Sequence, residues 1–165
     1  MRPIARYDYE QKILDTIDEH GWFDTHVFDP EESDPTFSYS VGFTETLAAP
    51  EFIVFGLEMK LMHNMLWSVF RQIRAGKAVM DGARWDDVLN GFECVSRRVD
   101  PSNVVRDYMN SAMWFWGDEA AKGPVPVFQL VWPGAVDGLF PWDEGCSETV
   151  RDFQPPLYMP RSMTH

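Results

Sequence analysis

Hydrophobic side chains recur along this chain with two different periods, and these periods predict its helices and strands. A first helix is predicted over residues 8–20, where apolar side chains recur at steps of three or four and Gly21 follows as a stop. A second, more regular stripe predicts a helix that ends at Gly76; its members are Leu61, Met62, Met65, Leu66, Val69, Phe70 and Ile73. Because the stripe is so regular, we expect it to be a core face and not a partner groove.

A third helix is predicted to open at Pro101, since proline is favoured in the first helical turn. Its expected shared face consists of Val104, Val105, Tyr108, Met109, Ala112, Met113 and Trp116. The segment 117–124 (GDEAAKGP) then interrupts the pattern. The third helix is therefore expected to end near Trp116.

Five segments have the composition of strands. Residues 36–43 alternate large apolar side chains with serine or glycine, a period of two that is typical of a strand. Residues 52–57 form a short continuous apolar run, which suits a strand that is buried on both faces. The others are rich in aromatic and β-branched residues and cover 22–28, 92–99 and 125–132. An acidic loop, 29–35, has a proline near each end.

The order of these elements predicts the fold class. Helices and strands follow in the order α-β-β-β-α-β-α-β, and several strands are adjacent in the chain. This order is typical of an α+β domain with a mixed, largely antiparallel sheet of five to six strands packed by two or three helices. A chain of 165 residues suits one domain, so we expect a single domain over 1–165, with a core over about 8–157 and a tail at 158–165.

Composition narrows the class of protein. Hydrophobic residues make up 45% of the chain and aromatic residues 15%, which excludes intrinsic disorder. No apolar run approaches the roughly 20 residues that span a bilayer, and the first residues lack the apolar centre of a signal peptide. The two cysteines, Cys94 and Cys146, form no CxxC pair and no disulfide framework. We therefore expect a reduced, cytoplasmic protein with no membrane partner.

The formal net charge of −12 argues against a nucleic-acid partner, because affinity for phosphate backbones comes from clustered Lys and Arg. The charge is uneven: residues 1–60 hold 13 acidic and 4 basic side chains, and residues 61–116 hold 6 and 7. We favour the interpretation that the two segments fold together and offset each other's charge. The alternative is an anion site in the middle segment.

Most sequence signatures of catalysis are missing. The chain has no GxGxxG or GxxxxGK[ST] phosphate loop, no GxSxG elbow and no HExxH pair. The histidines stand at spacings that resemble no helix or loop metal site, although they could converge in the folded chain; they are His20, His26, His63 and His165. The sequence therefore predicts no metal and no cofactor.

Four residues are weaker candidates for a site. Cys94 lies in a predicted strand and is expected to be a small buried side chain, while the nearby Arg97 keeps open the idea of an activated thiol. His63 lies on the polar side of the second helix, and we favour a solvated surface histidine over a catalytic base. Glu51 precedes a buried strand, and we favour an ordinary loop acid over a pocket carboxylate.

Gln129 is the more informative polar residue, because it shares a strand face with three valines. A buried amide must be hydrogen-bonded, so its partner is either backbone, which we favour, or a ligand. The second option defines a hypothetical pocket with aromatic walls and a few polar groups, as small-molecule sites usually have. Its candidate residues are Tyr39, Ser40, Gln129, Trp132, Asp137 and Trp142.

The stretch FQLVWPGAVDGLFPW, residues 128–142, carries many large side chains around a turn signal. Asp137 and Gly138 are expected to form a tight turn that returns the chain after Trp132. Phe140 and Trp142 would then fold back over the strand end. This arrangement predicts that Trp132 and Trp142 pack near each other.

An ordered set of motifs resembles a known family. FSYSVGF, APEFIVFGL, FQLVWPGAVDGLFPW and FQPPL are similar to the landmarks of the bacterial family known as domain of unknown function 4262, over about residues 21–157. The resemblance implies a small protein with a single domain and carries no established activity. In two places the chain departs from the family pattern. Ala49 stands where the family usually has histidine, and Gly134 stands where it usually has aspartate. A family site based on either residue would be altered or shifted here.

Two classes of function are compatible with the sequence. The first is a domain that binds a small polar or aromatic ligand in an aromatic-lined cleft, whether or not it also catalyses a reaction of that ligand. The second is an acidic interaction or immunity-like module that binds a basic partner protein, which the net charge favours. The aromatic residues and Gln129 favour the first class, and we expect ligand binding.

Overall fold

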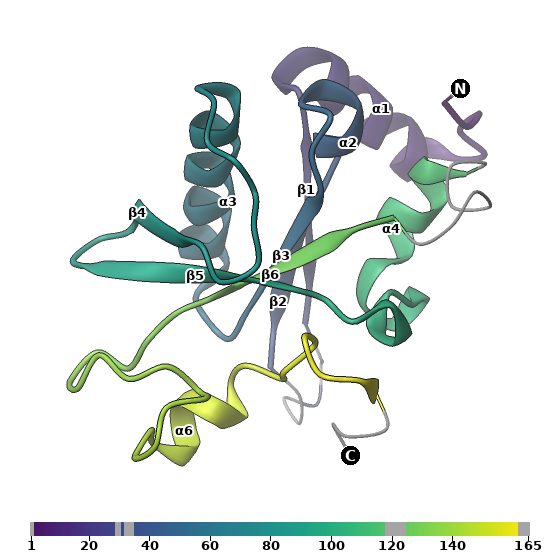
Figure 1. Ribbon diagram of the computed structural model, residues 1–165. Coiled ribbons are helices and arrows are strands. Elements are labelled where there is room, and N and C mark those ends of the chain that lie inside the picture. The colour runs from purple at the N-terminus through teal and green to yellow at the C-terminus, as the bar shows by residue number, and fades with distance from the viewer. Residues whose placement is uncertain (1, 29–30, 32–34, 118–124, 162–165) are drawn as a thin grey trace.

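Six strands form one continuous sheet at the centre of the fold (Figure 1). They are β1 (Phe23–Val27), β2 (Phe37–Val41), β3 (Glu51–Phe55), β4 (Arg84–Leu89), β5 (Phe92–Arg98) and β6 (Val127–Val131). Their order across the sheet is β1-β2-β3-β6-β5-β4, and neighbours are antiparallel except the parallel pair of β3 and β6. The computed structural model describes residues 2–28, 31, 35–117 and 125–161.

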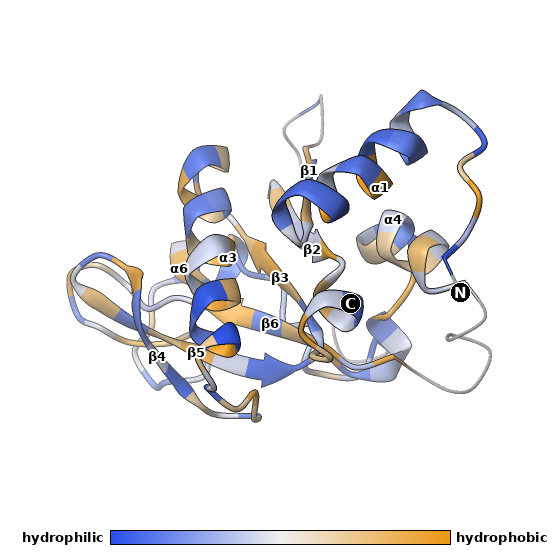
Figure 2. Cartoon of the chain, turned by 90° about the horizontal axis from the view of Figure 1, so that it is seen from above, coloured by the Kyte–Doolittle hydropathy of each residue, from blue (hydrophilic) through white to orange (hydrophobic). Residues whose placement is uncertain are grey.

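Three substantial helices pack on this sheet in the described part of the chain. They are α1 (Asp8–His20), α3 (Met59–Arg74) and α4 (Arg106–Trp116), and the shorter α2 (Phe43–Thr46) and α6 (Glu148–Asp152) lie in connections. α3 covers one face, while α1 and α4 cover the other, as the two views of Figures 1 and 2 show. The predicted α+β domain with a mixed, largely antiparallel sheet is confirmed. None of the described helices is long and apolar enough to cross a membrane.

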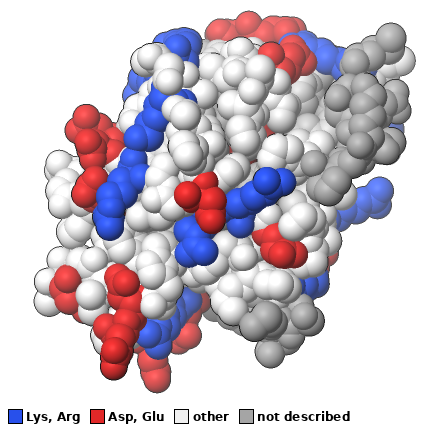
Figure 3. All heavy atoms as spheres, viewed as in Figure 1, with Lys and Arg blue, Asp and Glu red and all other residues white. Residues whose placement is uncertain are grey.

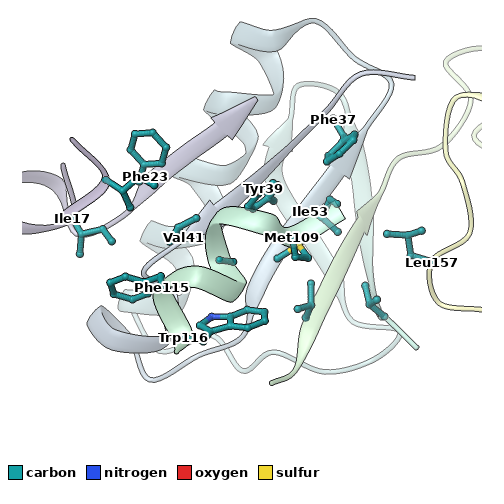
Figure 4. Close-up of a cluster of buried hydrophobic side chains, with 14 of the residues drawn as sticks. Ile17, Phe23, Phe37, Tyr39, Val41, Ile53, Met109, Phe115, Trp116 and Leu157 are labelled. Atoms are coloured by element: carbon teal, nitrogen blue, oxygen red, sulfur yellow. The ribbon is translucent and has the colours of Figure 1, made fainter. Parts of the chain in front are cut away.

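Two buried clusters follow from this layering, one on each face. The α1/α4 core contains Ile13 and Ile17 of α1, Tyr39 of the sheet, and Met109 and Trp116 of α4 among its members (Figure 4). The α3 core joins one side of α3 to the opposite face of the sheet and contains Trp22, Phe52, Met65, Trp85 and Trp132 among others. The central strands β3 and β6 contribute to both clusters because successive side chains point to opposite faces.

The two most periodic helices agree with the sequence prediction. α1 spans Asp8–His20, and Gly21 ends it in the left-handed conformation with φ 94°. The predicted stripe on α3 is core: Met62, Met65, Leu66, Val69 and Phe70 are buried, while the two end members of the stripe are partly buried. The preference for a core face over an exposed groove is therefore confirmed.

The third predicted helix is divided. Pro101–Asn103 forms a 3-10 turn, and the α-helix begins only at Arg106. Asp100 accepts a hydrogen bond from the backbone N–H of Ser102 and so caps the 3-10 turn instead of an α-helix. α4 itself is kinked at Met109, which has φ −133° and ψ 30°. The proline therefore opens a separate helical turn before α4.

Strand β4 is absent from the sequence prediction. Its buried residues are Trp85 and Val88, so the alternation of buried and exposed positions breaks between them. The register shifts within this strand, and Asp87 has a positive φ of 58°. A bulge inserts an extra residue, and the strand then lacks the period of two by which strands are recognised.

The chain turns sharply after β6, as predicted. The backbone N–H of Gly138 donates to the carbonyl of Gly134 at 2.9 Å, and the Asp137 carboxylate accepts from the N–H of Leu139 at 3.0 Å. Gly138 has a φ of 71°, a conformation that favours glycine. The predicted tight turn at Asp137–Gly138 is confirmed.

The predicted packing of Trp132 against Trp142 is wrong. Trp132 lies in the α3 core, and its indole N–H donates to the carbonyl of Phe55 at 2.8 Å. Trp142 stacks on Phe140, with ring centroids 5.2 Å apart, and Phe140 packs on Val131 at the opposite face. The turn returns the chain to the Val131 face, whereas the neighbouring Trp132 points the other way.

Three parts of the prediction fall partly or wholly outside the described residues. The acidic loop 29–35 contains residues 29–30 and 32–34, and the interruption 117–124 contains residues 118–124. The predicted tail 158–165 contains residues 162–165. Leu157, at the end of the predicted core, is buried in the α1/α4 core.

Candidate functional site

Asp24, His26 and His63 meet where the edge strand β1 faces α3. Asp24 and His26 are two residues apart on a strand, so both point to the same face. α3 brings His63 to that face, where its Nδ1 lies 2.6 Å from Oδ2 of Asp24. Nε2 of His26 lies 3.0 Å from the same oxygen. We call these three residues the β1/α3 cluster.

The β1/α3 cluster is partly open because β1 is the last strand of the sheet. The Asp24 side chain is only 7% exposed, whereas His26 is 25% and His63 40% exposed. The edge position therefore leaves a buried carboxylate that solvent can approach past two imidazoles.

Neighbouring side chains hold the two imidazole rings. Nδ1 of His26 lies 2.5 Å from the hydroxyl of Ser38, its cross-strand partner on β2. The ring of His63 stacks on Trp22, with centroids 5.7 Å apart and an interplanar angle of 24°. The ring of His26 therefore presents Nε2 to Asp24, and His63 presents Nδ1.

Burial controls the charges at this site. It raises the pKa of the Asp24 carboxyl, while the adjacent imidazoles of His26 and His63 oppose that shift. Burial also lowers the pKa of His26, against the attraction of Asp24. Both directions disfavour the charged forms, since a low-dielectric setting destabilises charge. In addition, Oδ1 of Asp24 is buried and has no hydrogen-bond partner among the described residues.

A hollow of about 290 Å³ opens beside the cluster. His26 lines it together with mostly apolar side chains, namely Val27, Phe28, Phe37, Leu57, Met59 and Met62, and with Thr36 and Glu58. His26 is thus common to the hollow and to the β1/α3 cluster. The arrangement joins an apolar cavity to nitrogen and oxygen groups that can bind a polar head or a metal ion.

The structure divides the residues of the sequence-predicted pocket between the two faces of the sheet. Tyr39 points into the α1/α4 core, where its hydroxyl accepts a hydrogen bond from the N–H of Ser111 at 2.9 Å. Ser40 points to the other face and donates to Glu51 at 2.8 Å. Tyr39 and Ser40 therefore do not share a pocket, because neighbours on a strand diverge.

Gln129 is fully buried and paired with backbone, the option that the sequence favoured. Its amide nitrogen donates to the carbonyl of Pro155 at 2.9 Å, and its amide oxygen accepts from the N–H of Leu157 at 3.0 Å. The backbone N–H of the nearby Trp132 is also paired, because it donates to the side-chain oxygen of Gln154 at 3.0 Å. These groups therefore hold the C-terminal segment on the sheet.

Asp137 and Trp142 lie elsewhere on the surface. Asp137 is used by its own turn, and Trp142 is 40% exposed beside a second hollow of about 300 Å³. Arg97, one of the weaker candidates, also borders this second hollow. Its guanidinium lies 4.8 Å from the Trp142 ring centroid and 4.4 Å from that of Tyr158, and it pairs with Asp81 at 3.1 Å. Because Arg97 already has three partners, this hollow is the weaker site.

The remaining weaker candidates take three different roles. Cys94 is fully buried, and burial raises its pKa to about 12, so the expected inert side chain is confirmed. Glu51 is also fully buried, and the interpretation of an exposed loop acid is wrong. Its carboxylate accepts hydrogen bonds from Ser40 and from the backbone N–H groups of Gly42 and Phe43. His63, expected to be solvated, is instead held by Asp24.

Sequence reasoning missed Asp24 and His26 as site residues. A signal was present, because Asp-x-His in a predicted strand places an acid and an imidazole on one face. The third member, His63, lies 39 residues from Asp24. Only the packing of α3 against the edge of the sheet brings it there. Among the described residues, this group of His and Asp could hold a metal ion, with its ligand atoms all within 4.8 Å of one another.

Charge is mixed on the face shown in Figure 3, where basic and acidic side chains alternate over short distances. Two ion pairs lie within the middle segment, one between Arg84 and Glu93 and one between Arg97 and Asp81. Arg2 likewise pairs with Asp18 of the acidic N-terminal segment. The contact between His63 and Asp24 joins the two segments, and the interpretation that they offset each other's charge stays a prediction.

Comparison with known proteins gives one match. The model of the family described as Domain of unknown function (DUF4262) matches residues 16–147, most of the chain, and includes all three residues of the β1/α3 cluster. No curated protein and no solved structure matches the chain. The family resemblance drawn from the sequence motifs is therefore confirmed.

Proposed function

We propose that this chain, which belongs to the family of domains of unknown function 4262, binds a small molecule between β1 and α3. The apolar body of the ligand would occupy the hollow, and its polar head would reach the β1/α3 cluster. The observation that carries this proposal is the position of His26, which lines the hollow and contacts Asp24. Small-molecule sites typically combine an apolar cavity with a few convergent polar groups.

The dimensions and chemistry of the hollow define the class of ligand. About 290 Å³ lies at the lower end of small-molecule sites, enough for one ring with a short chain. Phe28 and Phe37 provide aromatic lining, which suits an aromatic or aliphatic body. The unpaired Oδ1 of Asp24 favours a head group that donates a hydrogen bond, such as a hydroxyl or amine. The proposed ligand belongs to the class expected from the sequence, but the proposed site lies between β1 and α3 and not at the pocket expected around Gln129.

The proposal can be tested by NMR with 2-phenylethanol and 2-phenylethylamine as probes, in buffer that contains EDTA so that no metal ion contributes. We expect the backbone amide signals of β1 and of the first turns of α3 to shift most. These shifts should saturate as the probe is added. The methyl ether of 2-phenylethanol lacks the donor, so its affinity should be lower by about tenfold, the equivalent of one net hydrogen bond.

Two matched variants locate the site. Met59 lines the hollow and is 50% exposed, so Met59→Trp should obstruct binding without disturbing the core. Met80 is 62% exposed and is not among the lining residues, so Met80→Trp should leave the probe affinity unchanged. Equal binding by wild type and Met59→Trp would contradict this location.

The acidic interaction or immunity-like module is the second candidate, and the net charge of −12 favours it. That function would appear as a salt-sensitive complex with a basic protein and not as saturable binding of small probes. If neither probe shifts the NMR signals of the wild-type chain, the small-molecule proposal is contradicted. The interaction module would then be the better explanation.

A further inference from the structure

We propose that Asp24, His26 and His63 bind a divalent transition metal ion of the Zn²⁺ type. Two imidazoles and one carboxylate are a common protein ligand set for Zn²⁺ and related ions. Nitrogen ligands favour such ions over Mg²⁺ and Ca²⁺, which prefer oxygen. This inference goes beyond the proposed function, because the ion alone can be tested without any organic ligand.

The ligand atoms are already close to the required geometry. Oδ2 of Asp24 lies 2.6 Å from Nδ1 of His63 and 3.0 Å from Nε2 of His26, and the ligand atoms of all three residues lie within 4.8 Å of one another. Tetrahedral bonds to Zn²⁺ of about 2.0–2.1 Å would place ligand atoms about 3.3 Å apart. To admit an ion, the two distances from Oδ2 of Asp24 would have to lengthen by about 0.7 Å to His63 and about 0.3 Å to His26.

A second observation concerns the carboxylate itself. The Asp24 side chain is 7% exposed and faces the two imidazoles, yet its Oδ1 has no hydrogen-bond partner among the described residues. Leaving a buried acceptor unpaired is costly, and a simple Asp–His contact does not remove that cost. A cation bound at Oδ2 would offset the burial of the carboxylate's charge.

The surroundings also match those of a metal ligand set. His26 uses Nδ1 to contact the Ser38 hydroxyl, which orients Nε2 toward the ion. The ring of His63 is held by stacking on Trp22. Because the set has only three protein ligands and both imidazoles are partly exposed, a fourth position would remain for water or for a ligand.

The test uses the full chain, freed of metal with a chelator and then dialysed, and titrated with Zn²⁺ by isothermal calorimetry. We expect one Zn²⁺ per chain. His63→Ala should weaken binding at least about 100-fold, more than the loss usually found for an outer-shell partner. His20 is an exposed histidine on α1, so His20→Ala should leave the affinity unchanged. Circular dichroism establishes that each variant is folded.

NMR of the wild-type chain gives a measurement that does not depend on any variant. Zn²⁺ should shift the imidazole signals of His26 and His63 at one equivalent and leave those of His20 in place. Absence of stoichiometric binding, or binding that is lost in His20→Ala and retained in His63→Ala, would overturn the inference. Because the probe titration proposed above contains EDTA, a failure of metal binding leaves its result unaffected, and the two proposals can fail separately.

Discussion

The side-chain oxygen of Gln129 accepts a hydrogen bond from the backbone N–H of Leu157 at 3.0 Å. Together with the bond from the Gln129 amide to Pro155, this contact fastens the C-terminal segment to the middle of the sheet. Gln129→Leu should lower the free energy of unfolding by about 1–3 kcal/mol, because two buried backbone groups lose their partner. Denaturant unfolding measures the change.

The control for this substitution is Gln11→Leu. Gln11 is exposed on α1 and its side chain donates to Asp15, so its replacement should change stability by less than about 0.5 kcal/mol. If Gln129→Leu were as stable as wild type, the pairing with Pro155 and Leu157 would not contribute to folding. Gln129 would then have to be reconsidered as a ligand-facing group.

Met65 lies at the centre of the α3 core and is fully buried. Met65→Asp places an unpaired charge among apolar side chains, and such changes belong to the most destabilising class. We expect the chain to unfold or its melting temperature to fall by well over 10 °C. Met80→Asp, at a site that is 62% exposed, should leave the melting temperature nearly unchanged. A folded, monomeric Met65→Asp chain would indicate that this face of α3 is a groove.

The sequence predicted α1 and α3 well because their apolar residues repeat over several turns and glycine follows each helix. It missed β4 because the bulge between Trp85 and Leu89 destroys the period of two. Local pattern was sufficient where each element has one buried face. It failed where the backbone departs from regular geometry.

The candidate site could be predicted only in part. The alternation along a strand places Asp24 and His26 on one face, and it also separates Tyr39 from Ser40. Which strand lies at the edge, and which helix side chain reaches it, depends on long-range packing. The approach of His63 to Asp24 is such a contact, and no local pattern encodes it.

Glu51 makes stability depend on pH. Burial raises its pKa from 4.5 to about 7, against the hydrogen bonds from Ser40, Gly42 and Phe43. A carboxyl whose pKa is higher in the folded than in the unfolded chain makes its full contribution to stability below pH 4.5. That contribution is lost as pH rises through about 7. Its contribution to the free energy of unfolding should therefore fall between pH 4.5 and 7, by roughly 3 kcal/mol at most.

Comparison with Glu51→Gln isolates this contribution. The amide does not titrate, so the variant should lose the part of the pH dependence that Glu51 causes, whatever its absolute stability. Urea unfolding at several pH values between 4.5 and 7.5 measures the difference. Parallel curves for wild type and Glu51→Gln would show that the pKa of Glu51 is not raised by folding.

Gly56 and Gly82 have nearly the same positive φ angle in very different surroundings, so their alanine variants separate strain from crowding. Their φ angles are 79° and 81°. A Cβ atom at Gly56 would lie 2.5 Å from the carbonyl oxygen of Phe153, whereas at Gly82 it would have no neighbour within 4 Å among the described residues. Gly82→Ala should therefore lower the free energy of unfolding only by the cost of the left-handed conformation for alanine, about 1–2 kcal/mol. Gly56→Ala should lower it by that amount and by about 1–3 kcal/mol more, because the backbone after α6 must move away from the end of β3.

The difference between the unfolding free energies of the two alanine variants measures how tightly the C-terminal segment is packed on the sheet. Equal losses would mean that the Phe153 backbone yields freely and that its close approach to Gly56 does not hold this segment.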